Sequence, residues 1–119
     1  MIFQLVEDAL STLELPFAAD KMIMPTGEEL PDLFMVYKLI SSAPIAHADD
    51  GEELRSWRVQ VSVYSREGLE GLPDVAGAMV DAGFSRSNIT QIPLNPDTGH
   101  FGLALDFITS SDEEILESY

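Results

Sequence analysis

The sequence predicts an α+β fold: a mostly antiparallel sheet of four to five strands with two helices packed on one face. Three features predict it. A strand of strict alternation runs through a short turn into an amphipathic helix over residues 56–84, the N-terminus is amphipathic at helical spacing, and two extended runs near the C-terminus are joined by turn-forming residues. The predicted order of elements is α-β-β-β-α-β-β.

The first fifteen residues have apolar side chains at helical spacing, which predicts a helix that ends before Pro16. The apolar positions are Ile2, Val6, Ala9, Leu10 and Leu13. Residues 17–24 are expected to be irregular or to form a short extended segment. The turn formers Pro25, Thr26 and Gly27 bound that segment.

A long hairpin is predicted near residues 33–64. Its first arm contains the β-rich run FMVYKLI, its second arm alternates, and Asp50-Gly51 is a typical hairpin turn. Trp57, Val59, Val61 and Val63 fall on one face of the second arm. Pro44 has no N–H to donate, so it is expected at an edge or a break in the ladder. We expect the tip, residues 46–53, and the segment after Ser110 to be flexible in a free subunit.

The second helix and a second hairpin follow. Gly83 stands where a left-handed C-terminal cap is expected. Two strands are predicted over 89–94 and 101–108, around a turn at 95–99. The apolar stripe of the helix is Leu69, Leu72, Val75 or Ala76, Met79 and Val80, and the inward face of the last strand is Phe101, Leu103, Leu105 and Phe107.

Length and composition favour one globular domain. The 119 residues, 45% of them hydrophobic, fit a single domain over 1–109 followed by an acidic tail over 110–119. The chain has no cysteine, and Met1 leads into an amphipathic pattern unlike a signal peptide, so synthesis in the cytoplasm is expected. No apolar run approaches the ~20 residues that span a bilayer, so no membrane insertion is predicted.

The acidic balance disfavours ordinary nucleic-acid binding. Twenty-one Asp and Glu against six Lys and Arg give a formal charge of −15, which repels phosphate backbones. Three interpretations stay open: a highly soluble surface, a surface that repels or imitates DNA, and adaptation to high salt.

No motif predicts catalysis or a cofactor, because no nucleophile is paired with a base, and no metal-ligand cluster or phosphate loop is present in the sequence. His47 lies close to four carboxylates that suit a divalent cation, but their spacing is wrong for an EF-hand, and a solvated hairpin tip is favoured. The four are Asp49, Asp50, Glu52 and Glu53. His100 follows a turn and is predicted to be a surface histidine.

Several other side chains are candidates for contacts. Asp106 is expected on the exposed face of the last strand, where it can pair with Arg58 or Lys38. Tryptophan and arginine are enriched at interface hot spots, although Trp57 equally fits the core. The residues predicted to make a subunit or partner interface are His47, Asp49, Asp50, Glu52, Glu53, Arg55, Trp57 and Arg66, with Arg58 and Arg86 as further anchors.

Most of the chain resembles the tail-completion proteins of long-tailed bacteriophages, also called tail terminator or tail-to-head joining proteins. The resemblance is carried by LPDLFMVYKLI, a polar hairpin tip, WRVQVSVYSREGLEGL, a helix ending in DAGF, and TGHFGLALDF. It implies an α/β subunit that forms a ring, commonly a hexamer, when assembled. The isolated subunit can still be a monomer. The ring caps the tail tube, contacts the tail tube protein and the head connector or stopper protein, and carries no catalytic residue.

The function expected from this resemblance is that of a phage or prophage virion protein at the tail-head interface. DNA would pass through the ring without sequence-specific binding, and an acidic conduit does not adsorb it. The alternative from another class is an acidic DNA mimic that inhibits a nucleic-acid-binding protein. A small-molecule hydrolase or metal enzyme is a third hypothesis.

Overall fold

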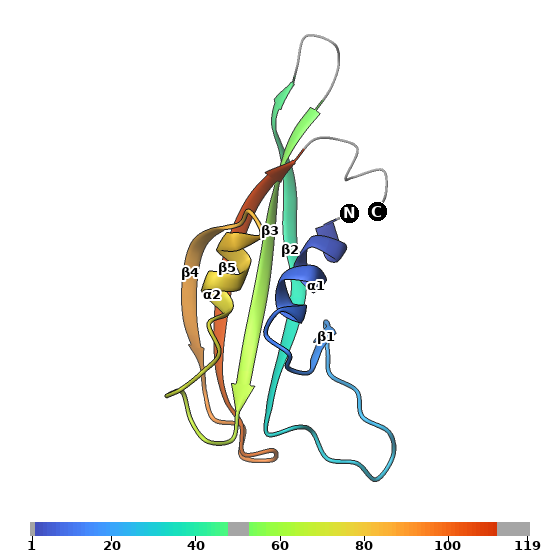
Figure 1. Cartoon of the computed structure of the whole chain (residues 1–119), viewed down its shortest axis with the longest axis vertical. Helices are drawn as coiled ribbons and strands as arrows, with labels where there is room; N and C mark the ends of the chain where they lie inside the picture. The colour runs from blue at the N-terminus through green and yellow to red at the C-terminus, as the bar shows by residue number, and fades with distance from the viewer. Residues whose placement is uncertain (1, 48–52, 112–119) are drawn as a thin grey trace.

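The structure describes residues 2–47 and 53–111. These residues form a five-stranded mixed sheet with both helices on one face (Figure 1). The structure is a computed structural model. Within those residues the strand order across the sheet is β1-β2-β3-β5-β4, and every neighbouring pair is antiparallel except β1 with β2. The predicted α+β class, the order of elements and the placement of the helices are confirmed. The elements are α1 (Ile2–Ser11), β1 (Phe17–Ala19), β2 (Leu33–His47), β3 (Glu53–Ser65), α2 (Val75–Asp81), β4 (Ser85–Ile92) and β5 (Phe101–Ser111).

The predicted first helix and short extended segment are both present. Helix α1 buries Ile2, Val6, Ala9 and Leu10 and ends at Ser11, so Leu13 packs on the core from the turn after the helix. The following turn ends at Glu14, whose backbone has a φ of 56°. Strand β1 then pairs in parallel with β2 near its beginning, from Phe17 opposite Met35 to Ala19 opposite Tyr37.

The long hairpin is β2 and β3. Its register runs from Leu33 opposite Ser65 to His47 opposite Glu53, with irregularities between Leu39 and Ser41 and between Pro44 and Ala46. The expected break at Pro44 is therefore confirmed. Of the segments expected to be flexible, 46–53 and the residues after Ser110, the described residues Ala46, His47, Glu53 and Ser111 are paired in strands. The Asp50-Gly51 turn and the flexibility expected of 48–52 and 112–119 concern residues outside the described ranges, and these stay predictions.

The second helix is shorter than its apolar stripe predicted. It begins at Val75, and Asp74 is its N-cap, accepting a hydrogen bond of 3.0 Å from the Gly77 N–H. The chain before it cannot be helical, because Gly68 and Gly71 have φ values of 99° and 72° and Pro73 follows. Leu69 and Leu72, predicted on the helix, therefore lie in this irregular segment.

The end of α2 follows the prediction. Gly83 has a φ of 105°, its N–H donates to Val80 O at 3.0 Å, and the Phe84 N–H donates to Met79 O at 3.0 Å. This pair of hydrogen bonds is a Schellman motif, and Phe84 is buried beside it. The cap turns the chain directly into β4, which begins at Ser85, earlier than the residue 89 predicted.

The core lies between the helices and one face of the three central strands. The odd-numbered residues of β3 and β5, and those of β2 as far as Leu39, point to this face, because Val61 of β3 lies opposite both Tyr37 of β2 and Leu105 of β5. The largest buried side chains on it are Trp57, Tyr37, Phe107 and Met35, and Ile2, Leu10 and Met79 cover them from the helices.

Tyr37 connects α1 to the sheet through a polar contact within this apolar layer. Its hydroxyl donates a hydrogen bond to the Glu7 carboxylate of α1, and its ring packs against Phe3 at a centroid distance of 6.1 Å. Burial first, and then the hydrogen bond and charge of Glu7, raise the pKa of the Tyr37 hydroxyl above its usual value.

Replacing Val61 with Asp should lower the free energy of unfolding by about 4 kcal/mol or more, because it leaves an unpaired charge in a fully buried position. Urea denaturation followed by circular dichroism measures the change. Val80→Asp, at a side chain 44% exposed on α2, is the matched control and should have a small effect. A Val61→Asp chain as stable as the wild type would reverse the assignment of the faces of β3.

Stability should fall as the pH rises above about 10, the value near which Tyr37 ionises in the unfolded chain. The raised pKa keeps the folded hydroxyl protonated, so the unfolded state releases a proton that the folded state retains. The slope from this group is about 1.4 kcal/mol per pH unit until the folded pKa is reached. Tyr37→Phe should remove this slope, measured by denaturant unfolding between pH 8 and 11, whereas Tyr64→Phe should retain it.

Candidate functional site

The distal part of the β2–β3 hairpin is a two-stranded arm that extends beyond the helices (Figure 1). Among the described residues, β5 pairs with β3 as far as Ser111 opposite Arg55, and beyond that point the recorded pairs are those of β2 with β3, Ala46 with Leu54 and His47 with Glu53. Arg55 braces the base of the arm, since its Nε donates to Ser42 Oγ at 3.0 Å and its Nη2 to Ser42 O at 3.4 Å. The molecule measures 53 × 29 × 23 Å along its principal axes.

The predicted interface residues divide into three groups. His47 and Glu53 form the last backbone pair of the arm, and their side chains, like Asp49, Asp50 and Glu52, lie outside what the structure describes. Arg55 sits at the base of the arm. The structure therefore brings the backbone of this group to one end of the sheet and separates it from Arg66, which lies at the opposite end of β3.

Trp57 belongs to the core. Its side chain is 1% exposed on the helix-covered face of β3, so in the folded subunit it is not available as an interface anchor. The alternative that the sequence left open, a core tryptophan, is the one observed. The reason is the alternation itself, since Trp57 shares its face with Val59, Val61 and Val63.

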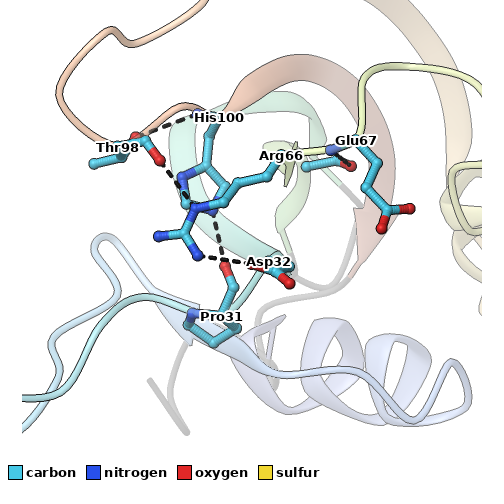
Figure 2. A network of polar contacts seen from close by, with 7 residues as sticks. Pro31, Asp32, Arg66, Glu67, Thr98 and His100 are labelled. Atoms are coloured by element: carbon cyan, nitrogen blue, oxygen red, sulfur yellow. Dashed lines mark hydrogen bonds and ion pairs between the residues drawn. The ribbon is translucent and has the colours of Figure 1, made fainter.

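Arg66 holds together three loops at the end of the sheet far from the arm (Figure 2). Its Nε donates to Thr98 O at 2.9 Å and its Nη1 contacts Asp32 Oδ1 at 2.7 Å. The Arg66 N–H donates to Asp32 O at 2.9 Å, which adds a backbone contact to the same loop. Asp32 is 73% exposed and the guanidinium 28% exposed, so solvent screens the ion pair and the geometric role dominates.

His100 is buried, which corrects the prediction of a surface histidine. Its side chain is 2% exposed, and its Nε2 lies 2.8 Å from Pro31 O (Figure 2). A carbonyl oxygen only accepts, so Nε2 carries the hydrogen. The ring packs edge-on to Phe34 at a centroid distance of 5.1 Å. The sequence pattern showed the turn before His100 but not the loop at Pro31 that covers it from 69 residues away.

The face of the sheet opposite the helices is organised in cross-strand rows. The first row is polar and runs from Lys38 through Gln60 and Asp106 to Asn88. Asp106 accepts a hydrogen bond of 3.0 Å from Gln60 Nε2 and lies 3.7 Å from Arg58 Nη2, so its predicted face and its pairing with Arg58 are confirmed. Arg58 Nη2 also donates to Ser87 Oγ at 3.1 Å, which ties β3 to the edge strand β4.

The next two rows form a trough and a ridge. Val36, Ser62, Ala104 and Thr90 make the row of small side chains. Phe34, Tyr64 and Ile92 make the row of large ones, in which Gly102 lies between Tyr64 and Ile92. A Cβ on Gly102 would lie 2.8 Å from Ile92 Cβ, so glycine leaves room for Ile92 in that row. A groove of about 340 Å³ follows the trough, and one of about 450 Å³ lies between the aromatic row and the loops at Met22 and Asn95.

Aromatic stacking and fixed hydrogen bonds hold the side chains that line these grooves. Phe34 and Tyr64 are stacked at 5.1 Å, and His100 is fixed by Pro31 with no hydroxyl or thiol placed as its nucleophilic partner among the described hydrogen bonds. Residues 2–47 and 53–111 contain no group of three His, Asp or Glu side chains able to hold a metal ion. These rows could not be predicted from the sequence, because they depend on the register between strands. The alternation within one strand does not show which residues of the next strand are its neighbours.

No protein-family model matches the chain, and no curated protein matches its sequence. Within the described residues, neither helix has the length and apolar character needed to cross a membrane.

Replacing Arg66 with Ala should cost about 1–2 kcal/mol of unfolding free energy, mainly through the lost hydrogen bond to Thr98 O. Arg66→Lys should recover little, since an ammonium cannot reach Thr98 and Asp32 with a planar fork. Arg86→Ala, an exposed arginine on β4, is the control and should change stability by less than about 0.5 kcal/mol. Thermal denaturation compares the three variants, and equal losses at Arg66 and Arg86 would contradict the bracing role.

Proposed function

We propose that this chain is a structural subunit that closes a bacteriophage tail tube as a ring and joins it to the head, and that it acts by assembly without catalysis. The observation that carries the proposal is the two-stranded arm of β2 and β3, which projects from a sheet whose core is already complete without it. A projecting pair of strands has no role in the subunit's own packing and is suited to reaching a neighbour.

A ring needs two different complementary surfaces on each subunit, because its contacts are head-to-tail. The chain offers two candidate surfaces: the arm, braced by Arg55 at one end of the sheet, and the edge strand β4 along one side of it. The tail tube protein and the head connector or stopper protein are the further partners of the proposal. In this arrangement the free subunit can be monomeric, since a ring gains its contacts cooperatively on the tail tube.

Charge is consistent with a conduit for DNA. Six subunits of −15 would place a large negative charge around the channel, which disfavours adsorption of the passing phosphate backbone. The DNA-mimic alternative needs carboxylates along one face at phosphate-like spacing. On the open face of β2, β3, β5 and β4, Asp106 is the one acidic side chain of the described strands, and it is paired with Gln60 and Arg58. No observation therefore favours the mimic.

Deletion of the gene that encodes the chain, followed by complementation, tests the proposal. Deleting the gene should leave heads and tails that do not join, seen by electron microscopy of induced lysates, and the wild-type gene in trans should restore joined particles. Arg55→Glu should fail to restore joining while the purified variant keeps its far-UV circular dichroism, because the base of the arm is altered and the core is not.

Ser42→Ala is the matched control for this experiment, since it removes the hydroxyl that accepts from Arg55 Nε and introduces no charge. It should restore joining at least in part. Complete particles in the deletion strain would overturn the proposal, and so would an enzymatic activity lost on replacement of His47 or His100 with assembly intact.

A further inference from the structure

The edge strand β4 is open along its outer side. It pairs with β5 alone, and seven of its eight residues are exposed. The other edge of the sheet, β1, is only three residues long. An open edge presents unpaired backbone N–H and C=O groups that another strand can complete. An irregularity at Ser87 leaves Asn88–Ile92 as the regular part of β4.

The surroundings of β4 also differ in charge from the rest of the chain. Residues 82–96 contain no acidic residue although the whole chain has 21, and the strand's one charged residue is Arg86. Arg86 is exposed, with no hydrogen bond or ion pair recorded for it among the described residues, and Arg58 reaches the same strand through Ser87. The edge therefore favours an acidic strand.

A hollow of about 310 Å³ lies beside β4 on the helix-bearing face. It is lined by Ala76 of α2, by the β4 residues 86–89, and by Leu105, Asp106 and Phe107 of β5. Asp106 is already paired with Gln60 and Arg58. Ile89 is 64% exposed, so its side chain offers apolar area at the rim of this hollow. Arg86 lies opposite Phe107 and Ile89 opposite Leu105, so the two are consecutive same-face positions, one strand repeat apart.

The matching strand must therefore be acidic and must carry a large aliphatic residue two positions from a carboxylate. The C-terminal segment 112–119, DEEILESY, lies outside the described residues and has this pattern. Extended, it would place Glu113, Ile115 and Glu117 on one face. If the added strand meets the irregularity at Ser87 as β5 does, Ile115 opposite Ile89 brings Glu117 opposite Arg86 in an antiparallel pairing and Glu113 opposite Arg86 in a parallel one. The segment has eight residues, as β4 does.

We propose that the C-terminal segment of one copy of this chain binds as an added strand to β4 of a second copy, with Ile115 in the hollow beside Ile89 and a glutamate against Arg86. The contact is head-to-tail, because a different surface is used on each copy. If the chain forms the proposed ring, this pairing is the contact between neighbouring subunits at β4. Only that identification rests on the proposed function. The experiment below needs no phage particle, so its failure and that of the particle experiment are distinguishable.

Mixing two variants of the full chain tests the inference. Ile89→Asp disrupts the surface of β4 that accepts the added strand, and Ile115→Asp disrupts the segment that is added. Each variant alone should therefore be monomeric by sedimentation equilibrium at concentrations where the wild type self-associates. Their equimolar mixture retains one intact contact per pair and should form heterodimers that grow no further. Leu116→Asp, one residue away on the other face, and Ile23→Asp, at an exposed isoleucine remote from β4, are matched controls and should self-associate within about threefold of the wild type.

Exchanging the charges of Arg86 and its partner glutamate tests the orientation of the added strand. Arg86→Glu should weaken self-association about tenfold or more, and Glu117→Arg in the same chain should restore it for an antiparallel pairing, or Glu113→Arg for a parallel one. A wild-type chain that stays monomeric up to about 1 mM would overturn the inference. So would mixed variants that form no heterodimer, as expected if each segment covered its own β4, or equal losses at Ile115 and Leu116.

Discussion

The structure depends on the position of β3, which is hydrogen-bonded along almost its whole length to β2 on one side and β5 on the other. A strand with two long neighbours cannot shift by one residue without moving every side chain to the opposite face. The alternation of Trp57, Val59, Val61 and Val63 therefore fixes the inward face of all three strands at once. The helices need only cover that face, which explains how a seven-residue α2 and a ten-residue α1 suffice.

The same constraint explains which parts of the fold the sequence could predict. Strand alternation, the Gly83 cap and the turn at 95–99 are local signals, and the elements they predict are present. The error at α2 came from an apolar stripe that continues through Leu69 and Leu72 into a segment where Gly68, Gly71 and Pro73 forbid a helix. There, backbone conformation outweighed hydrophobic spacing, because a glycine at positive φ ends a helix whatever its neighbours bury.

The surface was less predictable than the core, for a different reason. His100 and Arg66 acquire their roles from residues at Pro31, Asp32 and Thr98, which are distant in sequence and meet only after β2, β3 and β5 have paired. The alternation does place Asp106 on the open face, but its neighbours Gln60 and Arg58 follow from the register. A property of one strand can be predicted from its own residues, whereas a row across four strands needs the pairing of all of them.

Assembly of such an acidic chain sets two electrostatic effects against each other. Two subunits of −15 repel at long range, and salt screens that repulsion with a Debye length of about 8 Å at physiological ionic strength. The proposed contact at Arg86 would be local and partly desolvated, so salt would screen it less. The stretch 82–96, which has no acidic residue, lowers the repulsion for a partner that approaches β4, while the repulsion at the rest of the surface disfavours other geometries. In the proposed contact, charge would therefore supply specificity, while apolar burial beside Ile89 and backbone pairing would supply affinity.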